Sequence, residues 1–294
     1  MNLQEQYLNL IDQQKWLDQV ADPLQTAVRN AFQSTGKTGE EVMDFLHGTW
    51  LGHPLHSVLT DLPIGSYTAA EALDGLEVAT GNEDFGVGAD IAVLLGITGA
   101  ITSAVTGVTD WQHTSGHHRR IGMAHALLNT TSLGFYLASL AFRKQRKREA
   151  GRALGVLGYL AMTAAAYLGG HLVYNSKIGV DHAPQMDLPE KFTPAMALSD
   201  LPEDQLHRIE VNCIPILLVR RGDRVFAIAE TCSHLGGPLS EGQLMDDNTV
   251  ICPWHASRFS IEDGSLVNGP STYDQPCFET RIRDGQIEVR YAGS

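Results

Sequence analysis

Two short segments near the C-terminus combine residue types that bind metals. Cys232 and His234 are separated by one residue, and Cys252 and His255, which begin after a further 17 residues, are separated by two. Thiolates suit soft metal centres, and neutral imidazoles suit iron and zinc. Two cysteines and two histidines in paired loops can therefore hold one metal ion or one 2Fe–2S cluster.

Zinc is the alternative to an iron–sulfur cluster, because a Cys2His2 set also suits tetrahedral zinc. Zinc fingers usually carry their two cysteines together and their two histidines together. Here each of the two segments mixes one cysteine with one histidine. The mixed pattern favours the cluster over zinc.

The surrounding sequence resembles a whole Rieske 2Fe–2S domain. The resemblance covers about residues 192–290 and includes CSHLGGPLSEG, ICPWHASRF, EDG and NGPST. In such centres two thiolates bind one iron and two imidazoles bind the other. The resemblance implies an all-β domain in which Cys232 and Cys252 ligate one iron, and His234 and His255 ligate the other. It further implies that Gly236, Gly237 and Pro238 shape the first cluster loop and that Gly269-Pro270 belongs to a loop covering the cluster.

Several positions depart from the high-potential Rieske proteins of respiratory complexes. Gly237 and Trp254 stand where those proteins have two bridging cysteines, so that disulfide cannot form, and Phe259 stands where they have a tyrosine. Ser257 keeps a hydroxyl that can donate to a cluster sulfide, and Ala256 replaces a common glycine. Fewer hydrogen bonds to sulfur stabilise the reduced cluster less. We expect a midpoint potential in the lower half of the Rieske span of about −150 to +300 mV.

The remaining cysteines and the charge limit other functions. Cys213 lies in the apolar run 209–219 and Cys277 follows a proline, so both are expected to be ordinary strand residues. The net charge of −13 argues against a nucleic-acid partner. The C-terminal region is also acidic, which favours a basic docking surface on a redox partner.

Four apolar stretches in the middle of the chain predict a membrane domain. They cover about residues 54–76, 88–109, 121–142 and 153–174, and the last two contain no Asp, Glu, Lys or Arg. Each is close to the ~20 residues that cross a hydrocarbon core. The first stretch contains Asp61 and Glu71, which should face the bundle interior or water, and Pro63, which should kink its helix. A soluble four-helix bundle is the alternative, but its helices would carry charged faces.

This region also resembles a known family. HGTWLGHPLHSVLTDLPIGSYTAAEALD, GVTDW and YLGGHLVY are similar to a bacterial four-helix membrane family of unknown function, some members of which are fused to Rieske domains. The resemblance covers about residues 47–181 and supports the spans without supplying an activity.

The N-terminal segment and the loops bear on location. Residues 1–32 carry acidic residues and no apolar signal region, and they predict one or two amphipathic helices broken near Asp22-Pro23. The basic run 143–148 favours a cytoplasmic loop, which would export the C-terminal domain, whereas Arg119-Arg120 lie in the opposite loop. We expect a multi-pass protein of the cell membrane, and the side that carries the Rieske domain stays undecided.

Nine histidines outside the Rieske region are expected at one side of the bundle. His56, His125 and His171 lie near helix ends and could converge inside it. Paired imidazoles on facing helices can hold haem iron, and four-helix bundles host such cofactors. Haem b or a quinone site, a transition-metal site, and purely structural roles are the alternatives for these residues.

Together these patterns predict a multidomain protein, an all-α four-helix transmembrane bundle followed by an all-β Rieske 2Fe–2S domain. We expect amphipathic helices over 1–46, the membrane domain over 47–182, a linker over 183–190 and the Rieske domain over 191–294. The expected function is a membrane-anchored one-electron carrier that uses the cluster, rather than a stand-alone enzyme, and a haem or quinone in the bundle is an optional second electron site. Its partners would be a redox donor, a redox acceptor and the lipid membrane. The alternatives are a redox-sensing or regulatory membrane protein, and a ferredoxin component serving a separate oxygenase.

Overall fold

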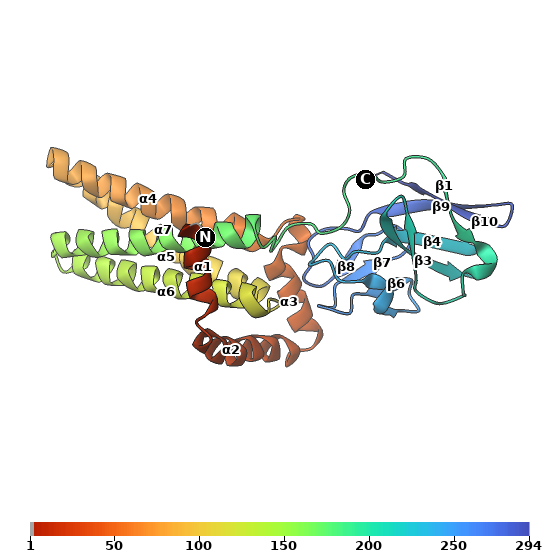
Figure 1. Ribbon diagram of the computed structural model, residues 1–294. Coiled ribbons are helices and arrows are strands. Elements are labelled where there is room, and N and C mark those ends of the chain that lie inside the picture. The colour runs from red at the N-terminus through yellow and green to blue at the C-terminus, as the bar shows by residue number, and fades with distance from the viewer. Residues whose placement is uncertain (1–2, 294) are drawn as a thin grey trace. The chain divides into compact units, whose positions relative to one another are not determined.

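The computed structural model describes residues 3–293 and divides the chain into two units (Figure 1). The helical unit contains the residues up to 39 together with 55–178, and the β unit contains residues 40–54 and everything from 179 onward. The ends of the first and last expected segments, residues 1, 2 and 294, lie outside the described residues. The expected order, a helical region followed by an all-β domain, is confirmed.

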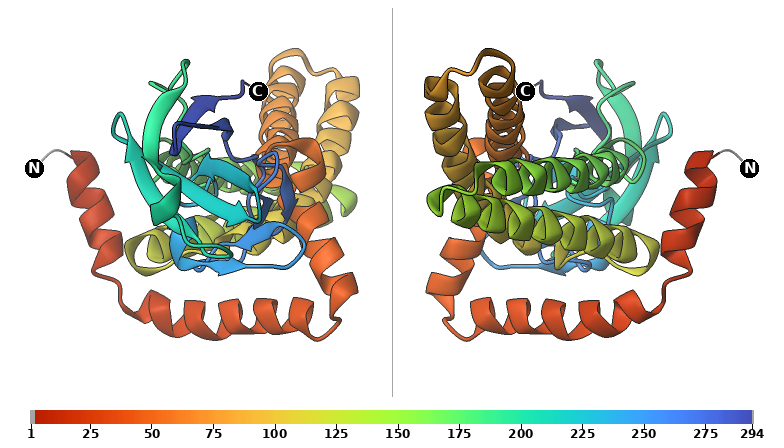
Figure 2. Two further views of the ribbon diagram at one scale, coloured as in Figure 1. Left: turned by 90° about the vertical axis from the view of Figure 1, so that its right-hand side faces the viewer. Right: turned by 90° about the vertical axis from the view of Figure 1, so that its left-hand side faces the viewer.

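Four long helices form the core of the helical unit: α4 (Leu55–Thr80), α5 (Glu83–Trp111), α6 (Gly116–Lys144) and α7 (Arg148–Tyr174). They pack as two antiparallel hairpins, α4 with α5 and α6 with α7 (Figure 2). Asn82 caps α5 by accepting a hydrogen bond from the Asp84 amide at 3.0 Å, which satisfies a free amide of the first turn. The four helices contain the four apolar stretches of the sequence.

The membrane character of these helices is uneven. Within the described residues, α5 and α7 are long and apolar enough to cross a membrane, whereas α4 and α6 are not. The acidic residues of α4 and the polar Asn, Thr and His residues of α6 lower their hydropathy. Two rather than four helices therefore carry the composition of a membrane span.

The two hairpins repeat one pattern of side chains. His56 and Tyr67 on α4 correspond to His125 and Tyr136 on α6, and both pairs lie 69 positions apart. In the first hairpin, Gly96 of α5 faces the Tyr67 ring and Gly107 faces the His56 ring, and neither glycine has room for a Cβ atom. In the second hairpin, Gly158 and Gly169 of α7 face the Tyr136 and His125 rings in the same way. The two tyrosine rings stack at 3.6 Å between centroids. Glycines thus let each ring lie against the backbone of its partner helix.

A buried ion-pair network occupies the other end of the bundle. The Arg143 guanidinium, 1% exposed, contacts Asp74 and donates to Asp90 at 2.9 Å. Arg148 donates to Glu77 at 2.6 Å and Arg152 lies 3.2 Å from the same carboxylate. Each of these charges has an opposite charge beside it, which is the condition for burying it.

From residue 3 onward, the helical region has seven α-helices, so a bundle of four helices is an incomplete description. The additional helices are α1 (Leu3–Asp12), α2 (Trp16–Gln33) and α3 (Lys37–His47). The expected break at Asp22-Pro23 is wrong, because α2 runs through Pro23 and the chain breaks between Asp12 and Trp16. Tertiary contacts occur before and after the proline: Asp18 and Asp22 bind Arg119, and Gln25 donates to the Trp111 carbonyl at 3.1 Å.

The β unit consists of two antiparallel sheets. The six-stranded sheet has the order β1 (Thr193–Ala197), β10 (Gln286–Tyr291), β9 (Cys277–Arg283), β4 (Arg224–Ala229), β3 (Ile214–Arg221) and β2 (His207–Val211). The second sheet has the order β5 (Gln243–Leu244), β6 (Thr249–Ile251), β7 (Arg258–Ser260) and β8 (Leu266–Asn268). Phe259, Val250 and Leu217 belong to a core that includes both cysteines of the predicted cluster. The two cysteines of the predicted site therefore pack directly against this apolar core.

Two cysteines lie outside that site. Cys213 is exposed in the tight turn between β2 and β3, with φ values of 52° for Asn212 and 66° for Cys213, so its expected strand position is wrong. Two consecutive positive φ values are typical of a type I′ hairpin turn, which interrupts the apolar run there. Cys277 opens β9, as expected of a strand residue.

Candidate functional site

Two loops of the β unit bring the four predicted ligands together. Cys232 and His234 lie in the loop after β4, and Cys252 and His255 lie in the loop between β6 and β7. The cysteines are 1% and 3% exposed, whereas both histidines are partly exposed. The two imidazole rings lie 5.0 Å apart between centroids and nearly perpendicular to one another. The thiols are thus inside and the imidazoles at the surface.

The two loops have the same backbone structure. Each cysteine amide donates to the carbonyl five residues later, Cys232 to Gly237 at 2.9 Å and Cys252 to Ser257 at 2.8 Å. The amide four residues later returns a bond to each cysteine carbonyl, from Gly236 and from Ala256. Gly236 and Ala256 have φ values of 78° and 62°, so the fourth position after each cysteine is left-handed. This turn closes both loops tightly around their sulfur atoms.

Backbone amides converge on each sulfur atom. Cys232 accepts hydrogen bonds from the amides of His234 and Leu235, and Cys252 accepts them from Trp254 and His255. Amides directed at sulfur stabilise its thiolate form, which is the form that binds metal. The donor arrangement therefore fits two metal-bound thiolates.

The two thiols also act on each other. Their mutual hydrogen bond lowers the pKa of Cys252 to about 7 and raises that of Cys232, because the bond stabilises one thiolate while Cys232 keeps its proton. Burial raises the pKa of Cys232 further. A positively charged metal centre can replace a proton that two neighbouring buried sulfur atoms share.

The ligand set also matches a two-iron cluster in number. It consists of a thiol pair and an imidazole pair, and each iron of a Rieske cluster takes one such pair. Between residues 3 and 293, no three His, Cys, Asp or Glu side chains are grouped as ligands of a single metal ion. Cys232, Cys252, His234 and His255 are the residues that we expect to hold such a cluster.

Three residues with predicted effects on the cluster surround these loops. The Ser257 hydroxyl accepts a bond from the Ser271 amide at 3.1 Å, so its own proton is available for another acceptor. A Cβ atom at Gly237 would lie 2.9 Å from the Cys252 sulfur and 3.0 Å from the Trp254 ring, so this indole closes the space beside the sulfur. Phe259 is fully buried and brings no hydroxyl group.

A third loop, residues 269–271, lies against the cluster loop that contains Cys252 and His255. The sequence did not predict the contact that fixes this third loop. Gly269 has a φ of 104°, and a Cβ atom there would lie 2.7 Å from the Ser257 Cα atom, so only glycine fits. Its amide donates at 2.9 Å to the Asp44 carboxylate, which comes from α3. Nothing in the local sequence around Asp44 indicates this contact, because the two residues are 225 positions apart.

The histidines of the helical unit lie at one end of the bundle. His56 opens α4, His125 lies in α6 and His171 lies near the end of α7, so antiparallel packing places them at the same end. His56 Nδ1 donates to the Ser103 carbonyl at 2.9 Å, and His125 Nδ1 donates to the Ala165 carbonyl at 2.8 Å. A carbonyl oxygen only accepts, so both imidazoles carry their proton on Nδ1 and present Nε2 as an acceptor. His56 and His125 are near enough for their charges to interact.

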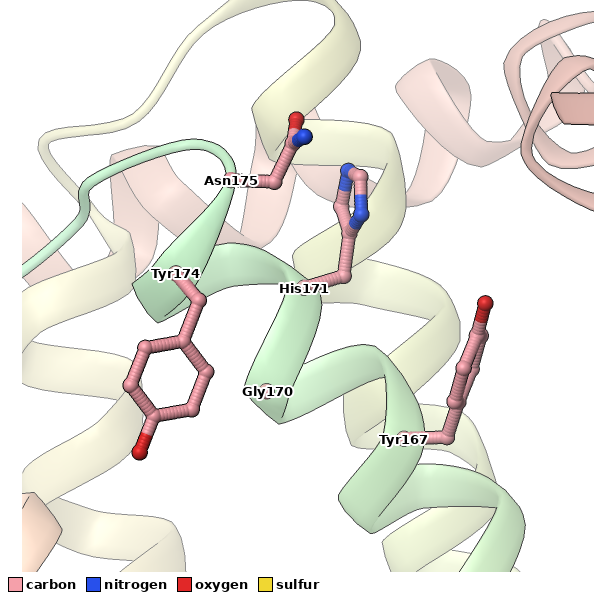
Figure 3. A pocket seen from close by; sticks show the side chains of 5 residues that line it. All are labelled: Tyr167, Gly170, His171, Tyr174 and Asn175. Carbon is pink, nitrogen blue, oxygen red and sulfur yellow. The ribbon is translucent and has the colours of Figure 1, made fainter. Parts of the chain in front are cut away.

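His171 has a different environment from the other two. It lines a pocket of about 400 Å³ on α7, together with Tyr167, Gly170, Tyr174 and Asn175 (Figure 3). Four of the five residues come from the end of α7 and Asn175 follows directly after it, and both tyrosine rings are exposed. His171 thus lines this pocket, whereas His56 and His125 each bond to the backbone of a neighbouring helix.

Family comparisons divide the chain in the same way. Residues 191–279 match the Rieske [2Fe-2S] domain. Residues 52–182 match a family described as predicted membrane protein (DUF2231). That match, with the two apolar helices, supports association with a membrane.

Curated relatives and solved structures resemble the C-terminal part. The 3-phenylpropionate/cinnamic acid dioxygenase ferredoxin subunit of Escherichia coli K12 is 34% identical over 95 residues, which are 32% of this chain and 89% of that protein. Ferredoxin CarAc of Metapseudomonas resinovorans is 32% identical over 94 residues, covering 32% and 87%. A solved complex of reduced oxygenase and oxidized ferredoxin in carbazole 1,9a-dioxygenase contains a chain that matches at 27% identity, with a TM-score of 0.33 and coverage of 36% and 99%.

The Rieske match covers both cluster loops and every strand from β1 to β8. The E. coli relative is matched over nearly its whole length. The chain therefore belongs to the Rieske [2Fe-2S] family through its C-terminal domain, which follows a domain of the DUF2231 family of predicted membrane proteins.

Proposed function

We propose that this protein is a membrane-anchored one-electron carrier whose Rieske cluster is held by Cys232, Cys252, His234 and His255. The observation that carries the proposal is the pair of matching loops, each with two amides directed at a cysteine sulfur. The names of the relatives, a dioxygenase ferredoxin subunit and a ferredoxin, support an electron-carrying role. When bound, the cluster supplies reversible one-electron chemistry.

The protein residues have separate roles in this proposal. Cys232 and Cys252 hold one iron in a buried position, and the amides around them balance the negative charge of their sulfur atoms. His234 and His255 hold the other iron and remain partly exposed, so their imidazole edges offer the shortest route for an electron to a partner. The apolar core beneath the thiols excludes water from that side.

The ligands and the potential can be tested together. We expect the purified full-length protein to show a Rieske EPR signal when reduced and a midpoint potential below about +75 mV, the centre of the Rieske span. His255→Ala should lose the Rieske signal, since one iron loses half of its protein ligands. A zinc-containing protein without an EPR signal would contradict the proposal, as would a midpoint above about +200 mV on the same scale.

The alternatives predict different partners. A ferredoxin serving a separate oxygenase, which is what the relatives' names describe for those proteins, should reduce a purified oxygenase component. A sensor should instead change its binding to a partner with the oxidation state of the cluster. Rapid electron exchange without such a change favours the carrier.

We also propose that α4 and α6 cross the membrane with α5 and α7, which makes this a four-span protein of the cell membrane. In the two helices that fall short in hydropathy, Arg143 and Asp74 meet inside the bundle, whereas Asp61 is exposed. The domain limits proposed are 1–46, 47–182, 183–190 and 191–294. Protein that stays with the membrane fraction after an alkaline wash is expected, and a soluble protein would contradict these spans.

The helical unit contains a candidate second redox site at His56 and His125. Histidines that bind metals usually donate their other ring proton to a carbonyl or carboxylate group, which fixes the ring. Both imidazoles do this, and each lies against a glycine of the partner helix. The Asn129 amide donates to His125 Nε2 at 3.1 Å and would have to turn away on binding. We infer that these imidazoles would hold haem b, which adds a second one-electron centre when bound.

Optical spectra test the haem assignment. Protein made with sufficient haem should show a Soret band and the narrow visible bands of bis-imidazole iron when reduced, and either His56→Ala or His125→Ala should lose them. His171→Ala is the matched control and should keep them, because His171 lines a different pocket. Absence of the Soret band, with the Rieske signal intact, would contradict the haem assignment and leave the carrier unaffected.

A further inference from the structure

The loop that lies against the second cluster loop is fixed by a residue from the other end of the chain. Asp44 lies on α3, in the segment 40–54 that packs with the strands as part of the β unit. Its carboxylate accepts the Gly269 amide proton at 2.9 Å. Two positions later, the Ser271 amide donates to the Ser257 hydroxyl at 3.1 Å. The loop 269–271 is therefore held at one end by a carboxylate and at the other by a cluster-loop serine.

The same segment makes further contacts with this part of the β unit. His53 packs edge-on against the Tyr273 ring, with 6.3 Å between centroids. The Tyr273 hydroxyl donates to the Gly179 carbonyl at 3.3 Å, and a Cβ atom at Gly179 would touch Pro54. Residues 40–54 thus contact the covering loop, residues 269–271, through Asp44, and they contact Tyr273 just after it through His53. Asp44 is therefore part of a larger contact surface and not an isolated side chain.

We propose that Asp44 is a positioning residue that orients the covering loop and sets the reduction potential of the cluster through its charge. This proposal depends on the cluster part of the proposed function. Gly269 packs directly on Ser257, so the carboxylate lies one layer of backbone away from the second cluster loop. Reduction adds one negative charge to the cluster, and a negative charge nearby makes that reduction less favourable.

The charge of Asp44 also makes the potential depend on pH. Burial raises the pKa of Asp44, and the Gly269 amide and the neighbouring His47 only partly oppose this effect, while Glu40 adds to it. As pH falls through this raised pKa, the carboxylate becomes neutral, and reduction becomes easier. Reduction in turn favours protonation, so one electron and a fraction of a proton are taken up together at acidic pH around this raised pKa.

Asp44→Asn separates charge from position. Asparagine keeps an oxygen that can accept the Gly269 amide, so the loop should stay in place while the negative charge is lost. We expect the redox equilibrium at pH 7 to shift toward the reduced cluster by up to about tenfold, which is 59 mV for a one-electron couple. The change of potential with pH on the acid side should disappear. Glu41→Gln, an exposed neighbour on the same helix, is the charge-matched control and should leave both unchanged.

Asp44→Ala tests position. It removes the acceptor, so the Gly269 amide should lose its protection from hydrogen exchange, and the EPR line shape should broaden as the covering loop loosens. Equal potentials and equal pH profiles for Asp44→Asn and Glu41→Gln would overturn the proposal, as would an unprotected Gly269 amide in the wild-type protein. A wild-type protein without a Rieske signal would overturn the proposed function itself, so the two failures are distinguishable.

Discussion

Ala256 shows how a single side chain constrains the second cluster loop. Its φ of 62° lies in the left-handed region, which costs a non-glycine residue about 1–2 kcal/mol. The equivalent position of the first loop is Gly236, with a φ of 78°. Glycine is common at the position of Ala256 in similar proteins, and the left-handed φ is the physical reason.

Ala256→Gly should therefore stabilise the loop. Relief of the left-handed strain outweighs the greater freedom of glycine in the unfolded chain, so we expect the free energy of unfolding of the Rieske domain to rise by about 0.5–1 kcal/mol. Thermal unfolding of the full-length protein, followed by loss of the cluster's visible absorbance, measures this. Ala292→Gly near the C-terminus is a control outside the loops, and an equal or lower unfolding temperature for Ala256→Gly would contradict the argument.

The ligand residues themselves could be predicted because their chemistry is local. A cysteine and a histidine one or two positions apart bring their side chains into one loop whatever the rest of the fold does. Asp44 could not be found in this way, because its contact with Gly269 depends on packing between segments at opposite ends of the chain. Cys213 was misplaced because an apolar run was read as continuous, although Asn212 and Cys213 adopt turn conformations.

At the scale of elements, the ion pair between α4 and α6 bears on the stability of the bundle. Arg143 and Asp74 are both at least nine-tenths buried and contact each other. Removing one member of a buried pair leaves an uncompensated charge, which typically costs about 3–5 kcal/mol.

Arg143→Met should therefore destabilise the helical unit. We expect a clear drop in the thermal unfolding temperature in detergent, measured by helical circular dichroism, because Asp74 would remain buried without its main partner. Lys144→Met removes one positive charge from the next, exposed position and should have little effect. Equal unfolding temperatures for the two variants would show that the pair contributes nothing measurable.

The helices were predictable in position but not in membrane character. Runs of small and apolar residues located all four, yet only α5 and α7 have the composition of a span. Pro23 was read as a break because its ring opposes a helix interior, but α2 is held before the proline by Arg119 and after it by the bond from Gln25 to the Trp111 carbonyl, and these contacts override that local preference. The local sequence preference therefore predicts where a helix breaks only when no tertiary contacts stabilise the helix at that point.

At the scale of the whole molecule, the division into units does not follow the order of the chain. Residues 40–54 precede the bundle in sequence but pack with the C-terminal strands. The sequence pattern divides them, since residues up to 46 were expected in the amphipathic helices and those from 47 onward in the membrane domain. Because the β unit takes its strands from residues after 193, the segment containing Asp44 is synthesised well before the loop that it contacts.

The matching hairpins carry a further consequence for how this bundle arose. Asp74 on α4 corresponds in the repeat to Arg143 on α6, and these two residues contact each other. Two identical copies of one hairpin would have brought aspartate against aspartate, or arginine against arginine, and like charges repel. A dimer of separate, identical halves could never contain this pair. The ion pair therefore requires the two hairpins to carry different residues at this position, which a single polypeptide permits.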